Sequence, residues 1–286
     1  MSGGNIVLGD NQYGKAETHV VRVYKRGATH DVKDMNVSVA LAGDFADVHL
    51  TGDNSNVVAT DTQKNTVFAF AADDIGEIED FALRLARHFV SEFGTVHRAR
   101  VSIEEFAWSR IGERAFERSG EVRRLTTVSC TRNGASVVSG VAGLVILKTT
   151  DSEFHGYIKD RYTTLQETRD RIMATALAAR WRYRDADVDW ARAYHDATRQ
   201  LKQTFAAHHS LSLQQTLYEM GKSVLEARDE IVEIRLSMPN KHHFVVDLEP
   251  FNLENPNEVF YAADRPYGLI EGTVRRDGAP DDPEAW

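Results

Sequence analysis

The chain has 286 residues, of which 42% are hydrophobic, so it can build one large core or two of ordinary size. Its 43 acidic residues against 34 basic ones give a formal net charge of -9, and no Lys/Arg-rich block occurs. This composition argues against nucleic acid as a partner. It leaves a small anionic substrate open, because one local cation in a concave site matters more to such a ligand than net charge does.

The cysteine content and the absence of apolar targeting segments indicate a cytoplasmic protein. The single cysteine, Cys130, cannot form an intramolecular disulfide and is interpreted as a core thiol in a reducing compartment. The start of the chain lacks the basic region of a secretory signal. The longest apolar stretch, residues 137–147, is shorter than the roughly 20 residues of a membrane-spanning helix. The ending, residues 284–286, lacks the peroxisomal address, and we expect no membrane partner.

In the first part of the chain, alternating hydrophobicity predicts strands over residues 19–24, 35–41 and 66–71. The apolar residues of the second of these share one parity and are expected to form a buried face: Met35, Val37, Val39 and Leu41. The period then changes. Residues 78–93 carry apolar side chains at helical spacing, which predicts an amphipathic helix that ends at Gly94.

The second part of the chain repeats the change from strands to helices. Aromatic residues alternate with arginines over 180–184, which predicts a strand with one buried and one cationic face. Two helices are expected over 190–205 and 213–224. Further strands are expected at 101–103, 122–130 and 137–147, and again at 231–238 and 244–248, before a loop-rich ending.

This order of elements suggests that one α+β unit has been duplicated. A turn at Asn133-Gly134 marks the expected seam. We therefore predict an α+β fold of two tandem units, residues 1–133 and 134–286, each with an antiparallel sheet and helices on one face.

Familiar cofactor and nucleophile motifs are missing from the sequence. No GxGxxG, HExxH, CxxC or GxSxG occurs, and Gly221-Lys222-Ser223 has Thr216 where a phosphate loop needs its first glycine. The pairs His208-His209 and His242-His243 point their side chains to different faces, so neither pair easily chelates one ion. A bound metal is the less favoured alternative, and we predict neither a metal nor a cofactor.

Three polar segments far apart in the chain instead indicate proton transfer. They are Tyr13-Gly14-Lys15, residues 58–62 and residues 239–243. Together they offer an amine, a threonine hydroxyl, an asparagine amide and an imidazole. Such groups suit acid–base chemistry better than metal or nucleotide binding.

Taken in chain order, these and further motifs resemble the urate oxidase (uricase) family over residues 11–270. The matching motifs are 13–15, 58–66, 147–150, 153–156, 161–165, 167–172, 213–216, 239–242 and 257–260. The resemblance implies two tandem tunnelling-fold (T-fold) units and a homotetramer with active sites at subunit interfaces. It also implies cofactor-free oxidation of urate by O2 and water to 5-hydroxyisourate and hydrogen peroxide.

The resemblance assigns four residues to binding the flat urate monoanion. Arg171 would grip one edge of the ring through two parallel N–H bonds. Gln214 would complement the opposite edge, assisted by the backbone amide of Leu213. Phe154 would stack on the ring face.

The resemblance assigns the chemistry to a relay of three side chains. Lys15 would be the base that removes a second proton from urate, acting through the Thr60 hydroxyl, with His242 completing the relay. Asn240, together with Thr60, would hold O2 and then water or peroxide above the ring. Thr60 and Asp61 would also contact the five-membered ring through backbone amides, from the neighbouring subunit.

Two positions depart from the eukaryotic pattern: His155 and His243 stand where aromatic residues are common. Taken singly, each proposed site residue also has an ordinary interpretation, such as an ion pair of Arg171 with Asp170 or Glu167. Two other functions stay open at this point. One is a non-catalytic purine-binding protein, and the other is a pterin-processing hydrolase or aldolase of the same fold.

Overall fold

The computed structural model describes residues 5–263 and 265–286, which form two compact units. The first unit holds the chain up to Ser139 together with Arg182–Ala191 and Pro280–Trp286. The second holds Gly140–Trp181 and Arg192–Ala279. Both units combine antiparallel strands with helices, so the predicted α+β class is confirmed.

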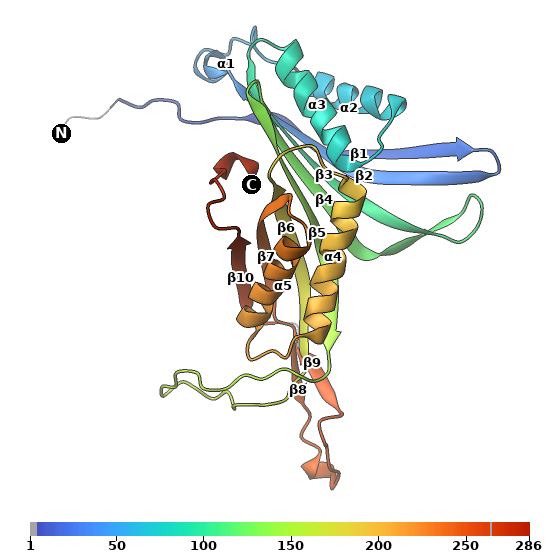
Figure 1. The fold of residues 1–286 in the computed structure, drawn as a ribbon. Helices are drawn as coiled ribbons and strands as arrows, with labels where there is room; N and C mark the ends of the chain where they lie inside the picture. The colour runs from blue at the N-terminus through green and yellow to red at the C-terminus, as the bar shows by residue number, and fades with distance from the viewer. Residues whose placement is uncertain (1–4, 264) are drawn as a thin grey trace. The chain divides into compact units, whose positions relative to one another are not determined.

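The first unit is built on four antiparallel strands that lie side by side in chain order. They are β1 (Tyr13–Arg26), β2 (Thr29–Gly43), β3 (Val96–Arg110) and β4 (Phe116–Thr131). Between β2 and β3 the chain forms α1 (Ala46–Leu50), α2 (Thr60–Asp73) and α3 (Ile78–Glu92). Figure 1 shows α2 and α3 next to each other above these strands, with α2 in contact with β1 and α3 with β3 and β4. A short 3-10 helix, η2 (Pro283–Ala285), packs on β4.

The core of the first unit confirms two predicted patterns and corrects a third. The predicted strand face of β2 is buried, and α3 ends at Glu92, close to Gly94. Residues 66–71, predicted as a strand, lie inside α2 instead. A short run of β-branched and aromatic residues does not distinguish a strand from a buried helix. Here Val67 and Ala71, one helical turn apart, are buried side chains of α2.

A buried carboxylate fixes α3 to the sheet. The Glu79 side chain is fully buried and accepts hydrogen bonds from Arg124 Nη2 at 2.7 Å and from Ser139 Oγ at 2.6 Å. Burial raises the pKa of the Glu79 carboxyl, against the opposing charge of Arg124. Arg124 also pairs with Glu77 at 2.7 Å. The helix is therefore held by direction-specific bonds as well as by its apolar stripe.

The second unit holds most of β5 (Gly134–Lys148) and β6 (Met173–Tyr183), followed in the sheet by β7 (Ile231–Pro239) and β10 (Leu269–Arg275). Its helices are α4 (Trp190–Ala207) and α5 (Leu213–Ala227). The strands β8 (His242–Val245) and β9 (Phe260–Ala263) pair separately as a small antiparallel sheet, with the 3-10 helix η1 (Glu249–Phe251) between them (Figure 1). A Cβ on Gly221 of α5 would lie 2.6 Å from Val274, so this helix packs closely on β10.

Three sequence predictions about the second part need correction. β9 and β10 lie in the segment predicted to be loop-rich; β9 has only four residues, and Gly272 interrupts the apolar face of β10. β8 begins at His242, earlier than the expected 244–248. Arg182 is buried and does not lie on a cationic face, since its Nη2 donates to the Pro280 carbonyl oxygen at 2.7 Å.

Within the part of the chain that the structure describes, no helix combines the length and the hydropathy needed to cross a lipid bilayer.

Two tyrosine hydroxyls of β1 tie this strand to the two ends of α2. Tyr13 Oη accepts from the Val58 backbone N–H at 2.8 Å and donates to the Val58 carbonyl oxygen at 3.0 Å. Tyr24 Oη donates to Asp74 at 3.0 Å and accepts from the Ile75 N–H at 3.2 Å. The beginning of α2 is therefore positioned by the beginning of β1.

We expect Tyr13→Phe to lower the free energy of unfolding by about 1–3 kcal/mol, because the buried Val58 amide loses its partner. Amide hydrogen exchange should speed up over residues 58–62. The matched control, Tyr24→Phe, should accelerate exchange near Ile75 and leave residues 58–62 unchanged. Equal exchange at residues 58–62 in both variants would contradict this account.

Candidate functional site

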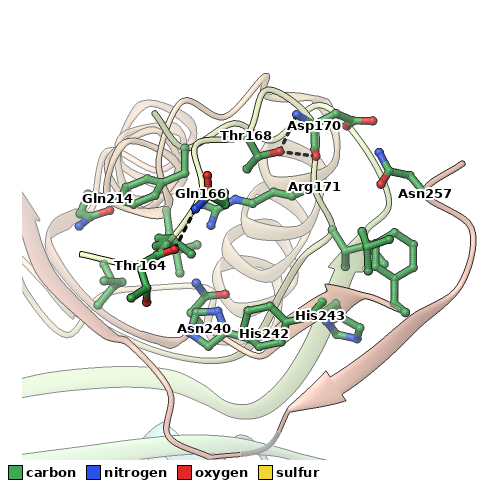
Figure 2. A pocket seen from close by; sticks show the side chains of 18 residues that line it. Thr164, Gln166, Thr168, Asp170, Arg171, Gln214, Asn240, His242, His243 and Asn257 are labelled. Carbon is green, nitrogen blue, oxygen red and sulfur yellow. Dashed lines mark hydrogen bonds between the residues drawn. The ribbon is translucent and has the colours of Figure 1, made fainter. Parts of the chain in front are cut away.

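A cavity of about 750 Å³ lies in the second unit (Figure 2). Its walls come from the loop between β5 and β6, the start of α5, Asn240 with the strand β8, residues 257 and 260 around the start of β9, and β10. Six of the residues predicted from the sequence line it: Phe154, Arg171, Leu213, Gln214, Asn240 and His242. The fold thus gathers side chains from five separate segments around one space.

Arg171 is a half-buried cation that faces the cavity without a counter-charge. Its Nε is buried and bonds to no group among the described residues, which also provide no ion pair to its guanidinium. The two expected ion-pair partners are engaged elsewhere: Asp170 accepts from Thr150 Oγ1 at 2.9 Å, and Glu167 pairs with Lys159 at 3.0 Å. Burial lowers the pKa of Arg171, so an anion in the cavity would relieve an electrostatic cost.

Phe154 forms a fixed aromatic surface beside this cation. Its backbone exchanges two hydrogen bonds with Thr168, at 2.8 and 3.0 Å. The ring stacks on Tyr157 with centroids 4.9 Å apart and planes inclined by 16°, and Tyr157 Oη donates to the Leu165 carbonyl oxygen at 2.6 Å. The Arg171 guanidinium carbon lies 5.1 Å from the Phe154 ring centroid. A flat, electron-rich ligand could meet an aromatic face and a cation at once.

The first turn of α5 supplies a second polar edge. Ser212 caps this helix, because its hydroxyl accepts from the Gln215 N–H at 3.1 Å. Leu213 and Gln214 are the first two helical residues, whose N–H groups have no partner within the helix. Leu213 is buried, whereas the Gln214 side chain is exposed at the cavity.

Asn240 lies between β7 and β8, and His242 is the first residue of β8. The backbone N–H of Asn240 donates to Gly268 at 2.8 Å, and that of Lys241 donates to Ala174 at 2.8 Å. The His242 ring stacks on Phe244 with centroids 5.6 Å apart. Burial lowers the pKa of His242, and the nearby charges of Arg171 and His243 lower it further. The imidazole is therefore neutral at pH 7 and able to accept a proton.

Lys15, Thr60 and Asp61 belong to the first unit and do not line this cavity. Thr60 is the first residue of α2, and its capping residue, Ala59, makes no side-chain bond to the helix. The pKa of Asp61 is lowered chiefly by the hydrogen bond from Lys64 and also, more weakly, by the charge of Lys15. Thr60 and Asp61 therefore lie at the N-terminus of a helix, where the macrodipole favours anions, and Lys15 lies on β1, near enough for its charge to act on Asp61.

Gly14 allows β1 to lie very close to β2 directly before Lys15. A Cβ on Gly14 would lie 1.8 Å from the Val39 carbonyl oxygen, so only glycine allows β1 and β2 to approach this closely. Directly after Lys15 the pairing of these strands shifts, and Glu17 has a φ of 53°.

The two histidines at unusual positions have different surroundings. His155 does not line the cavity; its Nε2 lies 2.9 Å from Glu153 Oε2. His243 does line it and bonds through Nδ1 to the Lys241 carbonyl oxygen at 3.0 Å. Several other lining residues, among them Gln166 and Asn257, had no role predicted from the sequence. Asn257 could have been predicted, because it begins one of the motifs that resemble the family, residues 257–260.

Over residues 5–263 and 265–286, no three histidine, cysteine, aspartate or glutamate side chains lie together in a way that could hold a metal ion.

The fold defines an α+β protein of two tandem tunnelling-fold units, and its second unit contains a cavity lined by an arginine and aromatic side chains. The family model for uricase matches residues 11–131 and 137–271. The uricase of Arthrobacter globiformis is 51% identical over 287 residues, covering 100% of this chain and 95% of the relative. The uricase of Dictyostelium discoideum is 38% identical, covering 93% of this chain and 96% of the relative.

A solved structure gives the same result. The crystal structure of the uricase from Arthrobacter globiformis matches with a TM-score of 0.95 at 51% identity, covering 98% of each chain. The chain belongs to the uricase family and is an oxidoreductase.

The charge of Arg171 should be measurable at His242. We expect Arg171→Met to raise the pKa of His242 towards its ordinary value, because one of the charges that disfavour the imidazolium is removed while burial persists. An NMR titration of labelled histidines would follow this change. The control, Arg169→Met, removes an exposed arginine that is not among the causes of the His242 shift. It should leave the pKa of His242 unchanged. An unmoved His242 in both variants would contradict the electrostatic account.

Proposed function

We propose that this protein oxidises urate by O2 and water to 5-hydroxyisourate and hydrogen peroxide, the first step of urate degradation, without a cofactor. The observation that carries the proposal is the half-buried Arg171, a cation without a counter-charge that faces the cavity beside the Phe154 ring. Urate is a planar monoanion at neutral pH and would supply both the missing charge and a stacking partner. Membership of the uricase family supports the same substrate.

Binding would use the groups that the cavity already presents. Arg171 would hold one edge of the purine by two parallel charge-assisted hydrogen bonds. Gln214 would match the opposite edge with its amide, and the backbone N–H of Leu213, which has no partner within α5, would add a donor. Phe154 would cover one face of the ring, while Tyr157 keeps it from turning.

The remaining groups would come from a neighbouring copy of the chain in a homotetramer. Thr60 and Asp61 begin α2, and Lys15 lies on β1 where its charge acts on Asp61, but none of the three lines the cavity of their own chain's second unit. If another subunit presents them at the cavity, the free amides of Thr60 and Asp61 would face the five-membered ring of the anion. The active site would then be complete only at a subunit interface.

The chemistry requires a substrate that can give electrons directly to O2. Lys15, acting through the Thr60 hydroxyl, would remove a proton from the urate monoanion and make it a stronger reductant. Two electrons pass from the resulting dianion to O2, which takes up two protons and leaves as hydrogen peroxide. Water then adds to the oxidised ring, and its proton returns through the relay. His242, neutral at pH 7, would accept that proton, and Asn240 would hold first O2 and then water.

The direct test is to measure urate and O2 together. Purified protein, dialysed against a chelator, should consume urate and O2 in equal amounts and form an equal amount of peroxide. The measurement is made near neutral pH, as expected for a cytoplasmic enzyme. Binding of urate without O2 uptake would indicate the non-catalytic purine-binding protein instead. Turnover of a reduced pterin with no loss of urate would indicate the pterin-processing alternative.

Two methionine substitutions should separate chemistry from binding. Lys15→Met should lower kcat by at least about a hundredfold and leave urate binding in the absence of O2 largely intact, because it removes the base.

Arg171→Met should instead raise the dissociation constant of urate by about tenfold or more, because it removes the charge-assisted contact. Without urate, its thermal midpoint should be no lower than that of the unaltered protein, since an unpaired buried charge is gone.

The control for Lys15 is Lys25→Met, an exposed lysine on the same strand, which should change neither quantity. A kcat for Lys15→Met equal to that of the control would remove the lysine from the mechanism.

A further inference from the structure

Glu153 lies directly before Phe154 and forms the centre of a charged cluster that the proposed chemistry does not use. Its side chain is 14% exposed. His209 Nε2 donates to its Oε1 at 2.8 Å, and His155 Nε2 donates to its Oε2 at 2.9 Å. Arg169 Nη1 lies 3.6 Å from the same Oε2. One carboxylate thus contacts side chains from three different parts of the chain.

Those three parts are the segments that carry the ligand-facing groups of the cavity. His155 follows Phe154, His209 precedes the cap of α5 and therefore Gln214, and Arg169 precedes Arg171. Successive side chains of an extended segment point to opposite sides, so Phe154 faces the cavity while Glu153 and His155 lie behind it. Neither Glu153 nor His155 lines the cavity.

The backbone brings the same segments together. Glu153 N–H donates to the Ser210 carbonyl oxygen at 2.7 Å, and Ser210 N–H donates to Asp151 at 2.9 Å. On the other side, Phe154 and Thr168 exchange two bonds. The segment 151–154 therefore lies between the segment that leads to α5 and the segment that leads to Arg171. The Glu153 side chain adds a bond to the first of these through His209.

The pKa values of Glu153 and His209 shift in the directions that strengthen their hydrogen bond. The hydrogen bond from His209 is the main cause that lowers the pKa of Glu153, and the bond to Glu153 is the main cause that raises the pKa of His209. Asp151 also faces His209, with an oxygen 3.6 Å from Nδ1. The carboxylate is therefore ionised across the neutral range and accepts both bonds there.

We propose that Glu153 is a positioning residue, which sets the spacing of Phe154 and Gln214 through its bond to His209. This inference rests on the proposed function, because its consequence is the fit of urate between those two groups. Displacement of a binding group by about 1 Å is enough to cost a large factor in binding or rate.

The test compares Glu153→Gln, His209→Ala and the double variant with the unaltered protein. Each single variant should raise the KM for urate by several-fold, up to about tenfold, with kcat changed by less than about twofold. The dissociation constant of urate measured without O2 should rise in parallel. The double variant should be no worse than the more affected single variant, since both remove one link. His209 is largely exposed, so its variant tests the link even where Glu153→Gln folds poorly.

The matched control is Asp44→Asn, which removes another carboxylate–histidine pair, with His97 at 3.1 Å, in the first unit. It should leave KM unchanged. If Glu153→Gln and His209→Ala lower only the thermal midpoint and leave KM at the control value, the cluster is structural and the inference is overturned. If the unaltered protein consumes no urate, the proposed function fails, which is a different result.

Discussion

The arrangement of the candidate site depends on one electrostatic constraint, the half-buried Arg171 that has no counter-charge among the described residues. Removing a guanidinium from water without pairing it is unfavourable, so a fold keeps such a group where a ligand supplies the anion. The constraint also acts on its neighbours. The same positive charge helps to keep His242 neutral, so an uncharged imidazole lies near a cation that has no counter-charge among the described residues.

The scaffold around Arg171 is stiff because most of its connections are hydrogen bonds with defined directions. Phe154 is fixed by Thr168 on its backbone and by Tyr157 on its ring, and the start of α5 is fixed by Ser212. The Glu153 cluster joins these segments from behind the cavity. Contacts of this kind pre-organise the walls of the cavity, and pre-organisation lowers the entropic cost of binding.

Local sequence patterns were most informative where one face of an element is buried. The parity of β2 and the apolar stripe of α3 could be read directly, because burial imposes a period of 2 or 3.6 on the residue types. Residues 66–71 were misassigned and are helical, and β10 was missed because Gly272 interrupts its apolar face. Arg182 was expected on an exposed face but is buried. Its partner, the Pro280 carbonyl oxygen, is too distant in the sequence for a local pattern to indicate it.

The sequence by itself determined the α+β class and the family, and it indicated six of the residues that line the cavity, since motif order and residue type are properties of the chain alone. It could not determine which side chains share a space. Only the tertiary structure decided that Asp170 and Glu167 bond elsewhere and leave Arg171 facing the cavity, and that His155 turns away to Glu153. Ion pairing depends on distances between segments far apart along the chain, and these distances are fixed by packing of the whole unit.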